Sequence, residues 1–142
     1  MMKNLMLITI TLALAWGRTA AQTNNRIIVE VENIKSSEGT LNVGVFNSEK
    51  TFLEEPWLSQ KKKAVANTLM VFEFTGVPDG AYTVSVYHDI NGNGELDTNF
   101  IGIPDEPYGV SREGRNMFGP PSYADAVFTL DGDNVRLRIT LE

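Results

Sequence analysis

The fold is decided by residues 77–88, which read Val-Pro-Asp-Gly-Ala-Tyr-Thr-Val-Ser-Val-Tyr-His. The Pro-Asp-Gly run has the chemistry of a tight turn, because proline fixes φ and aspartate and glycine favour turn conformations. After the turn, every second residue is large and apolar, so Tyr82, Val84 and Val86 share one face of an extended chain. This period of two predicts a turn that leads into a central strand with one face in the core.

The same alternation recurs along the rest of the chain, at residues 27–31, 41–45, 70–74, 126–130 and 135–141. No stretch shows a long helical period. About seven short strands separated by turn residues are typical of a sandwich rather than an α/β fold. We therefore predict an all-β protein that forms a single antiparallel β-sandwich.

Polar turn clusters suggest how the strands pair. Residues 36–39, Ser-Ser-Glu-Gly, predict a hairpin that joins 27–31 to 41–45. Asp-Gly-Asp-Asn after residue 130 predicts a second hairpin at the C-terminal end. Residues 47–63 mix charged with apolar side chains, and we expect a crossing loop there with one helical turn.

The beginning of the chain has the pattern of a secretory signal peptide over residues 1–21. Lys3 gives a positive start, a mostly apolar run follows, and Thr-Ala-Ala at 19–21 offers small residues for cleavage. We expect a mature domain of residues 22–142 that is periplasmic or secreted. The apolar run is short for a membrane span, and no cysteine follows it to carry a lipid anchor.

Charge and composition exclude several classes of function. Removing the signal peptide takes away two of the 12 Lys and Arg and none of the 18 Asp and Glu, which leaves a formal charge of (12 − 2) − 18 = −8. An acidic surface argues against a nucleic-acid partner. The chain has no cysteine, so disulfides, thiol catalysis and thiolate metal sites are also excluded.

One long connection interrupts the strands. Residues 89–124 separate the last central strand from the C-terminal hairpin, far more than a compact domain usually spends on one connection. Phe100, Ile103 and Tyr108 are among its large apolar side chains, and such content argues against disorder. We expect an ordered loop with a function.

The loop opens with residues 89–97, Asp-Ile-Asn-Gly-Asn-Gly-Glu-Leu-Asp. Oxygen-bearing side chains stand at the first, third, fifth and ninth positions, and glycine at the sixth permits the sharp bend of an EF-hand-type calcium loop. A hard divalent cation needs several oxygen ligands at once. We predict a structural Ca²⁺ whose ligands are Asp89, Asn91, Asn93, Asp97 and the main-chain carbonyl of Glu95.

This segment differs from a full EF-hand. Its twelfth position is Phe100 instead of a bidentate acid, and no flanking helices are predicted. Water, Asp105 or Glu106 would have to complete the coordination. The alternative is a tight turn without an ion, because Asn, Asp and Gly are common turn formers.

Three functions fit these features. The first is a non-enzymatic module whose ordered loop presents a surface to a protein partner or a glycan. The second is a small hydrolase or glycan-active enzyme that uses loop carboxylates and His88, and it requires His88, Asp97 and Arg112 around one deep pocket. His88 continues the inward parity of its strand, however, which favours a packed or hydrogen-bonded histidine. The third is a carrier of a small apolar ligand between the sheets, behind Phe72, Phe74 and Phe128.

Residues 88–104, the Tyr-Gly pair at 108–109 and Phe-Gly-Pro-Pro-Ser-Tyr at 118–123 together resemble the secreted bacterial family of domain of unknown function 2141. The resemblance extends from about residue 26 to 141 and implies export and a fold, but no activity. Residues 77–84 are also similar to the turn and strand of transthyretin-like and carboxypeptidase regulatory-like modules. An immunoglobulin-like or transthyretin-like sandwich is therefore what the resemblance implies, and fold analogy alone does not fix a function.

Overall fold

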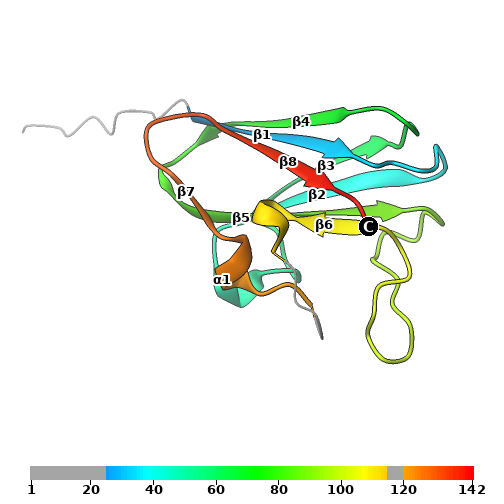
Figure 1. Cartoon of the computed structure of the whole chain (residues 1–142). Coiled ribbons are helices and arrows are strands. Elements are labelled where there is room, and N and C mark those ends of the chain that lie inside the picture. The colour runs from blue at the N-terminus through cyan, green and yellow to red at the C-terminus, as the bar shows by residue number, and fades with distance from the viewer. Residues whose placement is uncertain (1–24, 115–119) are drawn as a thin grey trace, which may run out of the picture.

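The computed structural model describes residues 25–114 and 120–142, and it is nearly all β, as predicted. Two sheets face each other in two layers (Figure 1). The predicted signal peptide, residues 1–21, lies outside the described residues. One sheet has the order β4-β1-β8, and the other has the order β3-β2-β5-β6 with β7 paired to β5. The strands are β1 (Asn25–Glu32), β2 (Thr40–Phe46), β3 (Leu58–Lys63), β4 (Met70–Val77), β5 (Gly80–Asp89), β6 (Tyr108–Val110), β7 (Phe128–Leu130) and β8 (Val135–Thr140).

The described helices are short: η1 (Glu49–Thr51), η2 (Ser111–Glu113) and α1 (Tyr123–Ala126). Within the described residues, none is long and apolar enough to cross a bilayer. The 3₁₀ turn η1 agrees with the one helical turn expected within residues 47–63.

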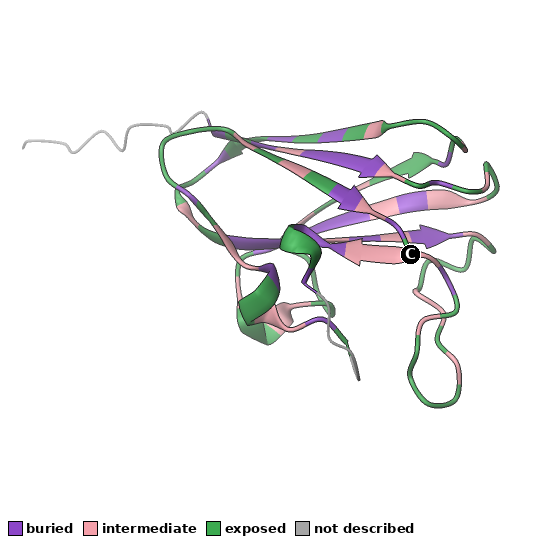
Figure 2. Ribbon diagram, in the orientation of Figure 1, coloured by how far each residue is buried: buried purple, intermediate pink, exposed green. Residues whose placement is uncertain are grey.

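The core lies between the two sheets and is built from the faces that the alternation predicts. Val29 from β1, Val43 from β2 and Val84 from β5 are at most 1% exposed. The buried residues line the inner faces of both sheets (Figure 2). Burial of these β-branched side chains is the main stabilising contribution to the fold.

Both predicted hairpins are wrong. β1 pairs with β4 antiparallel and with β8 in parallel, whereas β2 lies in the other sheet between β3 and β5. β7 pairs with β5 and therefore does not form a hairpin with β8. Each polar turn carries the chain from one sheet to the other. Parity shows which side chains face the core, but two strands in opposite sheets face the same core, so parity does not distinguish these arrangements.

Residues 58–63, expected to be part of a crossing loop, form the edge strand β3. Two of its inward side chains are polar because they hydrogen-bond across the open side of the sandwich. Gln60 Nε2 donates to the Glu73 carbonyl at 2.6 Å, and Lys62 Nζ donates to the Val71 carbonyl at 2.5 Å. Lys62 also lies 4.6 Å from the centre of the Phe72 ring. These donors satisfy carbonyls on the edge of β4, which an isolated edge strand leaves exposed.

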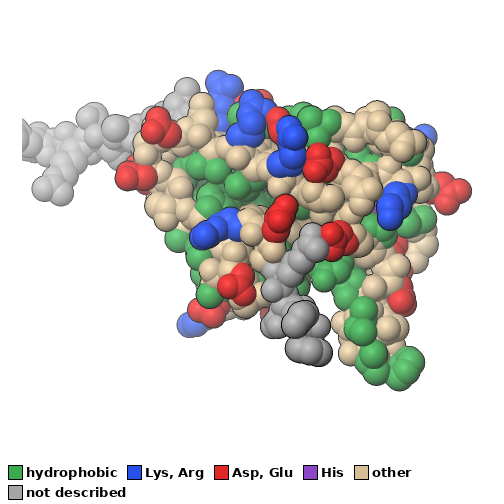
Figure 3. Space-filling model, in the orientation of Figure 1, with side chains coloured by type: hydrophobic (Ala, Val, Ile, Leu, Met, Phe, Trp, Pro, Cys, Tyr) green, Lys and Arg blue, Asp and Glu red, His purple; other side chains and the backbone are tan. Residues whose placement is uncertain are grey.

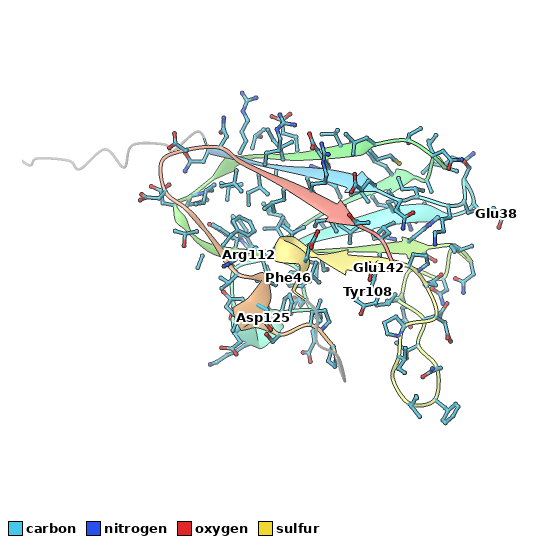
Figure 4. The ribbon with its side chains drawn as sticks, in the orientation of Figure 1. Glu38, Phe46, Tyr108, Arg112, Asp125 and Glu142 are labelled. Atoms are coloured by element: carbon cyan, nitrogen blue, oxygen red, sulfur yellow. The ribbon has the colours of Figure 1, made fainter. Side chains whose placement is uncertain are left out.

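The connection 89–124 is not wholly loop, because it contains β6 and η2 and ends in α1. β6 closes the other side of the sandwich: the Tyr108 and Glu142 backbones exchange two hydrogen bonds of 3.1 Å. Figure 4 shows Tyr108 and Glu142 side by side at this edge. A Cβ added at Gly109 would lie 2.5 Å from Ile139 Cγ2, so glycine permits this close approach.

Candidate functional site

Asp89 organises the start of the predicted ion loop. It is the last residue of β5 and is 0% exposed. Its Oδ1 accepts the backbone N–H groups of Gly92 at 2.7 Å and Asn93 at 3.1 Å, and its Oδ2 accepts that of Gly94 at 2.9 Å. The two glycines have φ of +76° and +85°, a conformation that other residues rarely adopt. The carboxylate therefore folds the chain around itself.

The side chains of Asn91, Asn93 and Asp97 converge on one another. Asn91 Nδ2 donates to Asp97 Oδ2 at 2.5 Å, and Asn93 Nδ2 donates to Asp97 Oδ1 at 2.8 Å. The Oδ1 atoms of the two asparagines accept backbone N–H groups two residues further on, from Asn93 at 3.0 Å and Glu95 at 2.9 Å. The loop thus forms a compact ring of oxygen-bearing side chains around the Asp97 carboxylate.

Glu106 fastens the two ends of this ring. Its side chain is buried, its Oε1 accepts the Ile90 N–H at 2.8 Å, and its Oε2 accepts the Asp97 N–H at 3.2 Å. Asp105, the other acid considered from the sequence, is exposed, and its N–H donates to the Asp97 carbonyl at 2.8 Å. The sequence offered both acids as candidates and could not show which of them contacts the loop, because that depends on how the chain turns between residues 97 and 105.

The ring is attached to the sheet through Tyr87. The Tyr87 hydroxyl donates to the Gly94 carbonyl at 2.9 Å. Burial raises the pKa of this phenol, and the carboxylates of Asp89, Glu106 and Glu95 raise it further. The phenol therefore keeps its proton and can donate at neutral pH.

The donor set has the chemistry of a calcium site only if amide and carbonyl oxygens take part. Within residues 25–114 and 120–142, no three His, Cys, Asp or Glu side chains lie close enough to hold a metal by themselves. A carboxylate has about four acceptor positions, and Asp89 uses three of them on the backbone, which leaves one for a cation. Phe100, at the twelfth position, is 99% exposed and therefore contributes no packing to the ring.

His88 is the packed, hydrogen-bonded histidine that its parity indicates. It is 1% exposed, and its Nε2 lies 2.7 Å from the Glu38 carbonyl, so Nε2 carries the proton in this contact. Glu38 lies at the far end of the molecule from Arg112 (Figure 4). The Arg112 guanidinium donates to the Val127 carbonyl at 2.9 Å. His88, Asp97 and Arg112 thus do not surround one pocket among the described residues.

The residues proposed to line an internal ligand cavity belong to the packed core. Phe72 and Phe74 are 0% and 4% exposed, and Phe128 is partly buried against the same cluster. A hollow lined by described residues lies elsewhere, on the outer face of the five-stranded sheet, with a volume of about 1390 Å³.

A projecting arm, residues 98–104, forms one wall of this hollow. Asn99 holds its turn: the Asn99 Oδ1 accepts the N–H groups of Ile101 and Ile103, both at 3.0 Å, and Thr98 and Pro104 form a β-bridge. Apolar side chains gather at the end of the arm (Figure 3). The ordered arm therefore exposes Phe100, Ile101 and Ile103 to solvent.

Fold and loop together define a class: a two-sheet β-domain whose central strand leads into a ring of acid and amide side chains and then into a projecting arm. The chain belongs to the family described as uncharacterized protein conserved in bacteria, DUF2141, whose model matches residues 29–138. This confirms the family indicated by the sequence motifs. Neither the curated proteins nor the solved structures include a match to this chain.

Proposed function

We propose that this protein is an exported, non-enzymatic β-sandwich module in which residues 89–97 bind one structural Ca²⁺. The ion would hold the loop and the arm so that they present a surface to a partner or a glycan. Asp89, Asn91, Asn93, Asp97 and the Glu95 carbonyl would supply the ligands.

The observation that carries this proposal is the convergence of Asn91 and Asn93 on Asp97. The Asp97 carboxylate is contacted by two neutral amide groups, at 2.5 and 2.8 Å. A divalent cation at the centre of the ring would replace these amide N–H groups as the partner of the carboxylate. Rotation of each amide would then turn its oxygen, which is the ligand that Ca²⁺ prefers, toward the ion.

Electrostatics favours the same conclusion. Asp97 and Glu106 meet at the Asp97 backbone, and Asp89 organises the chain only a few residues earlier. None of these three acids forms an ion pair with a described residue. These acids therefore place three negative charges in the loop, and a bound cation would compensate part of this charge.

A non-enzymatic role is supported by the distance between His88 and Arg112, the side chains that a hydrolase would need at one site. The Nε2 atom of His88 is occupied by the Glu38 carbonyl, and the Arg112 guanidinium donates to the Val127 carbonyl, well away from Glu38 (Figure 4). General acid–base catalysis needs such groups within hydrogen-bond reach of one substrate atom. A binding module needs only the surface.

Thermal unfolding in calcium and in chelator tests the ion site. A ligand that binds only the folded state stabilises it by about 2.7 kcal/mol at a concentration one hundred times its Kd. Calcium should raise the Tm of the wild type and leave that of Asp97→Ala unchanged. Asp105→Ala is the matched control, because it removes an exposed loop acid outside the ring and should retain the full calcium effect.

A Tm that is equal in calcium and chelator for the wild type would refute the ion. Export has a separate test, the mass and N-terminal residue of the protein recovered outside the cytoplasm. Cleavage after Ala21 gives Gln22 as the first residue, and retention of residues 1–21 in a cytoplasmic product would refute export.

A further inference from the structure

The hollow on the outer face of the five-stranded sheet has the shape of an open groove. Its floor is the sheet, and one wall is the segment after the calcium loop, with Ile101 and Ile103. Leu53 and Pro56 form the other wall, and Pro121 also lines the hollow. In Figure 1 the two walls project from opposite ends of the same sheet, so the groove runs across the strands.

A single row of side chains crosses this floor. The strand register aligns Lys61 of β3 with Asn42 of β2, Asn42 with Tyr87 of β5, and Tyr87 with Tyr108 of β6. Asn42 and Tyr87 point away from the core, because their chain neighbours Val43 and Val86 are buried in it. Lys61 and Tyr108 point the same way, because residues paired across neighbouring strands share a face of the sheet. Four strands with spacings of about 4.8 Å give a row of roughly 14 Å, longer than one small molecule needs.

The chemistry of the row is that of hydrogen bonding and aromatic contact, with little charge. It offers an amide, an ammonium group and two phenol rings, and Ser59 and Ser85 add hydroxyl groups in the next row. Among all residues that line the hollow, the charged ones are Glu54, Lys61 and Glu95. A surface that is poor in charge, in a protein with 21% charged residues, favours a neutral ligand.

A neutral ligand with both apolar faces and many hydroxyl groups is a carbohydrate chain. Its ring faces would stack on the tyrosines, which combine an apolar face with a polar end. Its hydroxyl groups would pair with Asn42 and the serines. An added peptide strand would pair along a free strand edge, such as that of β3, whereas the floor of the groove presents the side chains of four paired strands.

We propose that this groove binds a neutral oligosaccharide that lies across the four strands, stacked on Tyr87 and Tyr108 and hydrogen-bonded to Asn42 and Lys61. This assignment rests on the proposed binding function, because the arm that forms one wall follows the calcium loop. Tyr87 serves both, since its ring lies in the row and its hydroxyl holds Gly94.

Affinity gel electrophoresis tests the assignment directly. The native full-length mature protein is run through gels that contain a neutral β-glucan, xylan, glucomannan or dextran, and binding appears as retardation. At least one polysaccharide should retard the wild type. Tyr108→Ala should raise the Kd obtained from the retardation about tenfold, because one aromatic contact contributes about 1.4 kcal/mol.

Three variants sharpen the test. Asn42→Ala should weaken binding as well, and Tyr108→Phe, which keeps the ring, should restore most of it. Val71→Ala is the matched control, because Val71 is exposed on the three-stranded sheet and lies outside the groove. Circular dichroism shows whether each variant is folded, and the Tyr108 backbone bonds to Glu142 do not involve the substituted side chain.

Two outcomes would overturn the assignment: no retardation by any of the four polysaccharides, or retardation that Tyr108→Ala and Asn42→Ala leave unchanged. Repeating the gels with chelator separates this assignment from the calcium proposal. Binding that persists without any calcium effect on Tm supports the groove and refutes the ion. A calcium effect without retardation supports the ion and refutes the groove.

Discussion

Substitution Asp89→Ala tests how the loop is built before any ion is considered. The variant removes the acceptor of three backbone N–H groups, at 2.7, 3.1 and 2.9 Å. Asn93 retains a second acceptor, Asn91 Oδ1, whereas Gly92 and Gly94 lose the acceptor that the structure shows. Hydrogen bonds to a charged group contribute about 1.5 to 3 kcal/mol each. Both glycines are exposed, so water replaces part of each bond and the lower value applies.

Two such bonds give a loss of about 3 kcal/mol. For a domain of this size, this corresponds to a decrease in Tm of about 10 to 15 °C. The assay is thermal unfolding in chelator, followed by circular dichroism, so that no ion contributes. Asp97→Ala is the internal comparison: its carboxylate is half-exposed and contacts two exposed amides, and we expect a loss of at most about 1 kcal/mol.

A Tm for Asp89→Ala within about 2 °C of the wild type in chelator would refute this reasoning, since 1 kcal/mol already shifts Tm by more than that. Equal losses for the two aspartates would also contradict it. The glycines, and not the buried carboxylate, would then determine the conformation of the loop.

Three further predictions concern the rest of the domain. Hydrogen bonds from the Arg136 guanidinium, and secondarily from that of Arg138, lower the pKa of Glu30. The ionised Glu30 therefore stabilises the fold above its unfolded-state pKa, and this stabilisation is lost as pH falls through its folded-state pKa. Glu30→Gln should lower Tm near pH 7 and match the wild type near pH 2, and an equal difference at both pH values would contradict this. Gly109→Ala places a Cβ 2.5 Å from a side-chain methyl of β8 and should cost about 1 to 3 kcal/mol in urea unfolding, so an unchanged midpoint would show that β6 moves freely. Phe100→Ser should change stability by less than about 0.5 kcal/mol because the ring is 99% exposed, and a large decrease in Tm would show that another surface covers it.

Alternation alone was enough to predict the class of the fold and the core residues within its long strands, whereas buried residues such as Ile34 and Ala64 lie outside those segments. Val29, Val43 and Val84 face inward because a strand exposes alternate side chains to opposite sides. Pairing could not be predicted in the same way. β1 and β8 lie in parallel although more than 100 residues separate them, as the partners Ile27 and Val135 show, and no local pattern encodes such a contact.

Strand β3 was missed because its inward positions are polar. Gln60 and Lys62 have the composition of a loop, yet they satisfy the carbonyls of a strand in the other sheet. That role exists only once the sandwich is assembled. The one sequence signal for an edge strand here is the run of three lysines at residues 61–63, since charged side chains are common on exposed strand edges.

The loop motif identified the segment in which Asn91, Asn93 and Asp97 contact one another, but it did not identify the acid that holds the two ends of the segment. Asp89, Asn91, Asn93 and Asp97 follow a fixed spacing; the side chains of the last three contact one another, whereas Asp89 binds the backbone between them. Glu106 lies nine residues beyond Asp97, and its contacts depend on the complete turn of the arm. A sequence spacing predicts which side chains meet only within a regular segment. Glu106 follows an irregular turn, so its spacing from Asp97 does not show that the two residues are in contact.

Isothermal titration calorimetry of the chelator-treated protein with CaCl₂ tests the central claim most directly. The wild type should bind about one Ca²⁺ per chain, because residues 89–97 provide one ring, and Asp97→Ala should give no binding heat. Absence of binding heat in the wild type, or an unchanged isotherm in Asp97→Ala, would contradict the claim that this ring is a calcium site.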